Sequence, residues 1–172
     1  MLMFKIIYLA AMALFLGYLA MSLAFFGIPR AYSALYYLWD ERRNGWGLSF
    51  YLVNIVLVLA IMMVGLELSK GQNLQVLAFL FPAALAFVAA APRFQEQFEG
   101  TIHRIAAIVC AVAAVLWCLL VAHTWWMIPA AALLMLLLGS TSRTMRSSLT
   151  FWAEMAAFAC TFASMALMLF GG

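Results

Sequence analysis

The amino-acid sequence predicts an all-α protein, a polytopic membrane bundle of six transmembrane helices with a short interfacial helix after the first. Hydrophobic residues make up 69% of its 172 residues and charged residues 9%, whereas soluble domains contain about 45–50% apolar and about 25% charged residues. The apolar residues also fall into long runs, and roughly 20 such residues suffice to cross a bilayer. Six runs with short loops use up the chain, so we expect one transmembrane domain over residues 1–172.

The expected helices follow from where these runs begin and end. The first run is longer than the apolar stretch of about 7–15 residues in a signal peptide, and Gly27-Ile28-Pro29 ends it. Gly71, in the polar turn after the second run, terminates the second helix, because glycine readily adopts the left-handed conformation that closes a helix. The predicted transmembrane helices are 4–26, 48–66, 74–91, 101–122, 125–138 and 149–170.

The segment 30–47 is the most aromatic and polar part of the chain. Tyrosine and tryptophan favour the lipid headgroup layer, because their rings are apolar and carry a polar tip. The segment is typical of a helix lying in the membrane surface, and an ordered loop with anchoring aromatics is the alternative. The residues that we expect at the lipid interface, here and near 125, are Tyr32, Tyr36, Trp39, Trp46, Arg42, Arg43, Trp125 and Trp126.

The count of six depends on the break at His123-Thr124, because the runs 101–122 and 125–138 could instead form one long segment. The aromatic cluster around it, Trp117, Trp125 and Trp126, favours the break because it resembles an interfacial belt of tryptophans. The basic residues favour the break as well. With six helices, seven of the nine Lys and Arg residues lie on one side, and only Lys5 and Lys70 lie on the other. Because basic loops stay cytoplasmic, both termini are predicted to be non-cytoplasmic. With five helices, the split would be five against four.

Glu154 is the first candidate for a functional residue, because it lies within the last apolar run. An ionisable group inside a membrane span is costly unless it faces the bundle interior or a wet cavity. Glu154 is therefore a candidate proton, cation or ligand site. The alternative is a pairing with Arg143 or Arg146 near the interface.

The segment Glu96-x-x-Glu99-x-x-x-His103 is the second candidate ligand or ion site. Glu99 and His103 are four residues apart, so they would share one face of a helix. A carboxylate and an imidazole can bind zinc or act as an acid/base pair, whereas acidic residues also simply favour helix N-termini. We assign no catalytic residue, no metal site and no cofactor.

The run Ala91-Pro92-Arg93-Phe94, followed by Glu99-Gly100-x-x-His103-x-x-Ala106-Ala107, resembles the start of a helix in small bacterial six-helix membrane proteins of the DRAM/Frag1-like or domain-of-unknown-function type. The resemblance covers residues 91–107 and implies only a six-helix fold. The chain lacks the multiple histidines of ceramidase-like and adiponectin-receptor-like hydrolases, and this difference argues against them.

These observations favour a small transport, channel or accessory subunit over an enzyme. The alternatives are a membrane enzyme acting on lipid at the cytoplasmic face, and a structural or interaction protein of a larger membrane complex. We expect the lipid bilayer as a partner, together with a homo-oligomer or a protein partner, and no nucleic acid, because the basic residues lie in membrane loops. Short loops favour a bacterial inner membrane.

Overall fold

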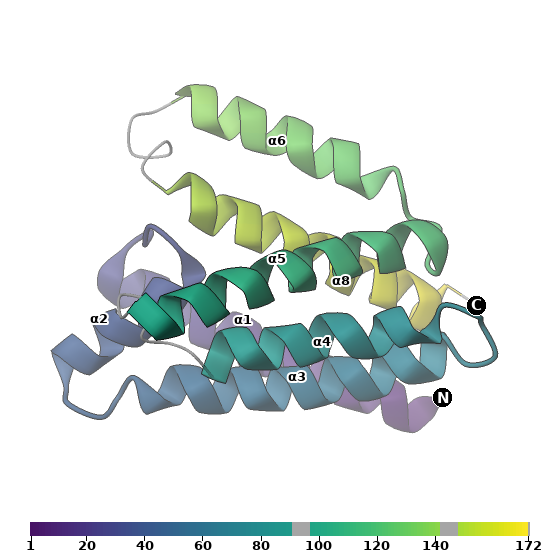
Figure 1. The fold of residues 1–172 in the computed structure, drawn as a ribbon, viewed down its shortest axis with the longest axis horizontal. Coiled ribbons are helices and arrows are strands. Elements are labelled where there is room, and N and C mark those ends of the chain that lie inside the picture. The colour runs from purple at the N-terminus through teal and green to yellow at the C-terminus, as the bar shows by residue number, and fades with distance from the viewer. Residues whose placement is uncertain (91–96, 142–147, 172) are drawn as a thin grey trace.

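The computed structural model describes residues 1–90, 97–141 and 148–171, and these are helical with no strand. This confirms the all-α class. Labels follow Figure 1, and α7 does not appear among the described elements. The helices are α1 (Leu2–Phe26), the 3-10 helix η1 (Tyr32–Ala34), α2 (Leu35–Arg42), α3 (Leu48–Leu68), α4 (Gln75–Ala90), α5 (Gln97–Leu120), α6 (Met127–Thr141) and α8 (Leu149–Phe170).

The long helices run back and forth between two ends of the molecule (Figure 1). We call the end that carries η1 and α2 the α2 end, and the opposite end, where the N- and C-termini lie, the terminal end. Each of α3, α4 and α5 packs against the preceding long helix, and α8 contacts α1, α3 and α5. Helix α6 lies at the edge of the bundle and packs chiefly against α8.

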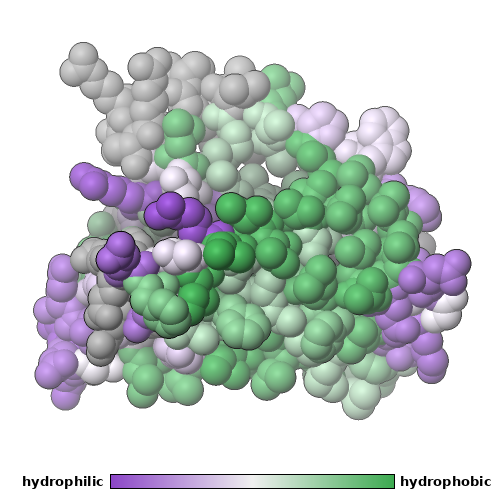
Figure 2. All heavy atoms as spheres, viewed as in Figure 1, coloured by the Kyte–Doolittle hydropathy of each residue, from purple (hydrophilic) through white to green (hydrophobic). Residues whose placement is uncertain are grey.

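Four helices, α1, α3, α5 and α8, are long and apolar enough to cross a bilayer, and they indicate a multi-pass membrane protein. Helix α4 is apolar but has 16 residues, which gives a length of about 24 Å at a rise of about 1.5 Å per residue. Figure 2 shows an apolar surface across the middle of the molecule, with hydrophilic residues gathered at its two ends. That distribution matches a hydrocarbon layer between two aqueous interfaces.

The chain breaks after α5, as the aromatic cluster near His123 predicts. Helix α5 ends at Leu120 and α6 begins at Met127. His123 adopts a positive φ of 54° between them, a conformation that is uncommon outside turns for residues other than glycine. The two apolar runs are therefore separate helices and not one long segment.

Part of the segment after α1 forms a short helix, α2, whereas the alternative was an ordered loop throughout. Two of its expected interface residues are buried instead, since Tyr32 is 4% exposed and Trp39 is 2% exposed. The Trp39 indole N–H donates to Ser22 Oγ of α1 at 3.0 Å, and its ring packs edge-on against Phe26. These two rings therefore pack inside the bundle, where a polar tip can be satisfied as well as in the headgroup layer, and their position relative to the lipid interface stays a prediction.

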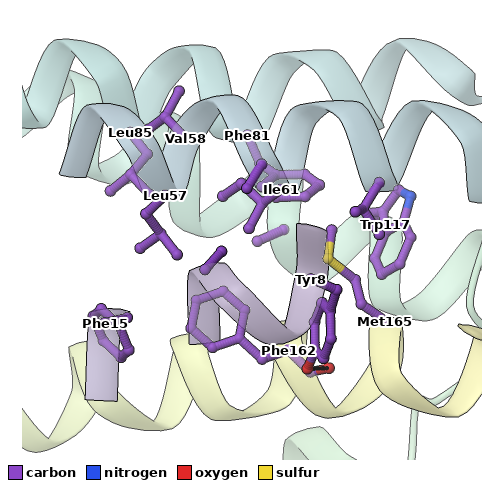
Figure 3. Packing of buried hydrophobic residues seen from close by; sticks show 14 of the residues in the cluster. Tyr8, Phe15, Leu57, Val58, Ile61, Phe81, Leu85, Trp117, Phe162 and Met165 are labelled. Carbon is purple, nitrogen blue, oxygen red and sulfur yellow. Dashed lines mark hydrogen bonds between the residues drawn. The ribbon is translucent and has the colours of Figure 1, made fainter. Parts of the chain in front are cut away.

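The core joins α1, α3, α4, α5 and α8, and Figure 3 shows aromatic and branched side chains from these helices meeting at its centre. A close approach occurs at Gly65 of α3. A Cβ built there would lie 3.3 Å from Met165 Cε of α8 and 3.5 Å from Ala78 Cβ of α4. The missing side chain lets three helices converge, as small residues do in membrane bundles.

Polar side chains tie the helices together at the terminal end. The indole N–H of Trp117, on α5, donates to Ser69 Oγ at the end of α3 at 2.9 Å. In the turn after α5, the Thr124 hydroxyl forms a hydrogen bond with the Ser164 hydroxyl of α8. All four side chains are buried, and we call them the terminal-end cluster.

Candidate functional site

A cavity of about 220 Å³ lies between α3, α4, α5 and α8, with η1 at one of its walls. Its walls are mainly apolar, and they carry few polar residues. Helix α5 presents only small side chains to it, at helical spacing: Ala107, Cys110, Ala111 and Ala114. The side chains with oxygen or nitrogen atoms in the wall come from η1, α3 and α8: Tyr32, Ser33, Asn54, Glu154 and Thr161. We call this space the Glu154 cavity.

Glu154 reaches the cavity from the N-terminal part of α8, which begins at Leu149. Five residues along a helix correspond to about 8 Å, so the carboxylate lies a short way in from the α2 end. Its Oε2 accepts a hydrogen bond from the backbone N–H of Tyr32 at 2.6 Å. Close by, the backbone N–H of Phe151 donates to the Arg30 carbonyl at 3.1 Å. These two bonds fasten the start of α8 to the segment after α1 and hold the carboxylate in place.

The contacts of Glu154 bear on both interpretations of this residue that the sequence offers. The carboxylate does line a cavity, as the functional interpretation requires. It also satisfies an N–H at the start of η1, because the first N–H groups of a helix lack partners within the helix. Arg143 and Arg146 lie outside the described residues, so the predicted pairing with them stays a prediction.

The Tyr32 ring forms the next part of the wall and meets Asn54 of α3. Asn54 Nδ2 lies 3.2 Å from the Tyr32 hydroxyl and donates to the Phe50 carbonyl at 2.7 Å. Burial raises the pKa of the Tyr32 phenol well above its ordinary value, because a dry environment disfavours the charged form. The hydroxyl therefore stays protonated and remains able to donate a hydrogen bond.

A second cavity of about 220 Å³ lies between α5, α6 and α8. It shares lining residues with the Glu154 cavity, so the two spaces adjoin: Ala111, Ala114, Ala153, Ala157 and Thr161 line both. Its other walls are apolar or weakly polar, including Cys118, Ile128 and Met135. We call it the α6 cavity. The Glu154 cavity and the α6 cavity are therefore neighbours on either side of this group of small side chains.

The second predicted site is only partly within the described residues, because Glu96 falls outside them. Glu99 and His103 lie in the first turns of α5. The His103 ring Nδ1 lies 3.2 Å from the Val88 carbonyl of α4. Across residues 1–90, 97–141 and 148–171, no three His, Cys, Asp or Glu side chains come together in a way that could hold a metal ion. The lipid-enzyme interpretation of these residues stays a prediction.

Most of the other residues expected at the lipid interface are at the surface. Trp46, Trp125 and Trp126 are exposed, whereas Tyr36 is half-buried. The guanidinium of Arg42 lies 4.4 Å from the Phe25 ring centroid, and that of Arg43 lies 5.2 Å from the Trp46 ring centroid. Both distances are within the range of cation–π attraction. The α2 end therefore presents basic groups held against aromatic rings.

Sequence reasoning missed the aromatic part of the site. On α8, Glu154 is followed by Phe158, Thr161 and Phe162, all of which line the cavity. These positions follow the i, i+4, i+7 and i+8 spacing of one helix face. The pattern was visible in the sequence, but a stripe of phenylalanines in a membrane span gives no sign of whether it meets lipid, protein or a cavity.

Comparisons with protein families, curated proteins and solved structures found no match for this chain.

Proposed function

We propose that this chain crosses a membrane six times, with α4 and α6 spanning alongside the four longer helices. The alternating direction of the six helices supports the proposal, as does the position of both termini at one end. The α2 end carries Arg30, Arg42, Arg43 and Arg104, whereas Lys5 and Lys70 belong to the terminal end. By the positive-inside rule, the α2 end is cytoplasmic and both termini are not. We assign it to a bacterial inner membrane, as a homo-oligomer or with a protein partner.

Within that topology, the proposed function is transport: a small transporter, channel or accessory subunit with Glu154 as its proton or cation site. The observation that carries this proposal is the Glu154 carboxylate in the wall of a cavity inside the bundle. Ionisable groups within membrane spans mark ion pathways and proton relays, because their cost is tolerated only where they have a partner or a cavity. A carboxylate can accept about four hydrogen bonds, so contact with the Tyr32 N–H leaves it capacity for a ligand.

Proton flux into proteoliposomes, followed with an enclosed pH-sensitive dye under an imposed potential, tests this function. We expect Glu154→Gln to reduce the flux to that of protein-free liposomes, because a side-chain amide does not bind and release a proton as a carboxylate does. Glu41→Gln is the matched control, since Glu41 is an exposed carboxylate on α2, and we expect it to leave the flux unchanged. Wild-type flux in Glu154→Gln would exclude Glu154 from the pathway.

A further inference from the structure

The aromatic rings in the wall of the Glu154 cavity restrict what the cavity can bind. Five rings line it, from η1, α3, α4 and α8: Tyr32, Phe50, Phe81, Phe158 and Phe162. Several are in mutual contact. The ring centroids of Tyr32 and Phe158 are 5.6 Å apart, and the rings of Phe158 and Phe162 are stacked at 5.6 Å. Phe15 of α1 supports this group from behind, with ring centroids 5.2 Å from Phe158. The rings are therefore held in place before any ligand arrives.

The charge in the cavity has the sign that these rings favour. The face of an aromatic ring is electrostatically negative and attracts cations, most strongly where water is excluded. Glu154 adds a carboxylate to the same wall, and Asn54 adds a side-chain carbonyl. None of the lining residues that the structure describes is Lys, Arg or His. Such a wall attracts a positive group and repels an anion.

The adjoining α6 cavity sets the shape of the rest of the ligand. A small inorganic cation beside Glu154 would leave the second cavity empty. An apolar chain extending from the Glu154 cavity would pass the alanines that line both spaces, Ala111, Ala114, Ala153 and Ala157. Each buried methylene group would add favourable contacts there.

We propose that the two cavities together bind a hydrophobic organic cation, with its ammonium group beside Glu154 and the aromatic rings and its alkyl chain in the α6 cavity. This inference rests on the proposed function in one respect: it names the substrate class of the same site. The carboxylate balances the charge, the rings surround the alkylated nitrogen, and the alanine walls leave room for the chain. Quaternary ammonium recognition by aromatic side chains follows the same physics.

Equilibrium binding of radiolabelled dodecyltrimethylammonium to the purified full chain in dodecyl maltoside tests the inference on the wild-type protein. Dodecanoate and dodecanol are the matched ligands, because they carry the same chain with a negative or a neutral head. We expect saturable binding of the ammonium compound alone. Equal binding of dodecanol would show a site for hydrocarbon only, and tighter binding of dodecanoate would reverse the charge preference. Either result overturns the proposal.

Three variants locate the site. Glu154→Gln should raise the Kd about tenfold or more, because it removes the counter-charge while keeping the side-chain shape. Phe158→Leu should raise it about two- to tenfold through loss of a ring face. Ala156→Leu should weaken binding of the twelve-carbon compound but not of tetramethylammonium, because Ala156 lines the α6 cavity and not the Glu154 cavity. Glu41→Gln is again the control, and an unchanged Kd in Glu154→Gln would overturn the proposal.

The two proposals fail separately. Proton flux is measured without any organic cation, so flux that depends on Glu154 without dodecyltrimethylammonium binding would overturn the ligand class and leave the proposed transport function standing. Binding that depends on Glu154, with no flux, would support the ligand site and remove the proton pathway.

Discussion

The two ends of this bundle place polar side chains in different surroundings. At the terminal end, Trp117 with Ser69 and Thr124 with Ser164 form hydrogen bonds between helices, and none of the four lines either cavity. At the α2 end, Glu154, Tyr32 and Asn54 also form hydrogen bonds, but all three line a cavity of about 220 Å³. A buried polar group is costly unless it is hydrogen-bonded, and the polar side chains named here meet that requirement at both ends.

The difference lies in what the polar groups adjoin. In the terminal-end cluster, protein atoms surround the donors and acceptors, so substitutions there should change stability. At the α2 end the polar groups border open space, so the same kinds of substitution should change stability less and ligand binding more. Stability and binding, measured side by side on variants from both ends, therefore test whether the two ends have different roles.

The largest effect on stability should come from Trp117→Ala. The Trp117 side chain is 0% exposed and donates to Ser69 Oγ, so the change leaves a large void and an unpaired hydroxyl. We expect a loss of about 3 kcal/mol in the free energy of unfolding, at the low end of the range for Trp→Ala in protein cores, because lipid adds no hydrophobic driving force between helices. Denaturant titration in mixed micelles measures it.

Phe158→Ala is the partner variant at the α2 end. Its side chain lines the cavity and is only partly buried, so fewer contacts are lost. We expect less than half of the stability loss of Trp117→Ala, together with weaker binding of dodecyltrimethylammonium. Equal stability losses at the two sites would remove the distinction between the ends.

A second comparison uses two neighbouring alanines of α5. Ala113 is 2% exposed and lines neither cavity, whereas Ala114 lines both. Ala113→Leu should cost about 1–3 kcal/mol, because inserting methylene groups into a filled core forces its neighbours apart. Ala114→Leu should be close to neutral, since its added carbons enter empty space. Paired thermal unfolding curves in detergent measure the difference, and a similar loss in both would mean that the cavity cannot accept the side chain.

Much of the helical framework could be predicted from hydropathy alone. The last helix was expected at 149–170, and α8 spans Leu149–Phe170. The break near His123 was expected from Trp117, Trp125 and Trp126. The rings of Trp125 and Trp126 are exposed there, whereas Trp117 is buried. Length and composition suffice for such features, because a membrane span needs about 20 apolar residues and interfacial tryptophans mark its end.

The direction of individual side chains could not be predicted in the same way. Trp39 and Trp46 are close in the same segment, yet Trp39 donates to Ser22 inside the bundle and Trp46 is exposed. Both environments satisfy an indole, so composition does not distinguish them. The cavity could not be predicted from the sequence either, because alanines such as Ala107 and Ala114 suggest close helix packing. Only the arrangement of α5 relative to α8 shows that these alanines face a cavity.

Ser164→Ala should have a smaller effect than the core substitutions. The Ser164 hydroxyl is shared between Thr124 and the Cys160 carbonyl, and the loss removes the bond between α8 and the turn after α5. Hydrogen bonds between membrane helices contribute about 0.6 kcal/mol on average, and we expect a change of that order in the same titration. Thr101→Ala is the control, because its hydroxyl donates to the Gln97 carbonyl within the same helix, α5. A loss above that of Ala113→Leu would show that the cluster is a cooperative network.

Glu154→Gln should have only a small effect on stability, although it has the largest expected effect on binding. The glutamine side-chain carbonyl can still accept the Tyr32 N–H that Glu154 Oε2 accepts now, so the fastening of α8 to η1 survives and the unfolding free energy should change by no more than about 0.5 kcal/mol. Glu154→Leu removes the acceptor and should cost about 1–3 kcal/mol, because it leaves a buried N–H unpaired. If Gln is as destabilising as Leu, the negative charge itself holds the α2 end together. If Glu154→Gln leaves the free energy of unfolding unchanged but abolishes binding and flux, then the hydrogen bond to Tyr32 accounts for the structural role of Glu154. Its negative charge then serves ligand binding and not stability.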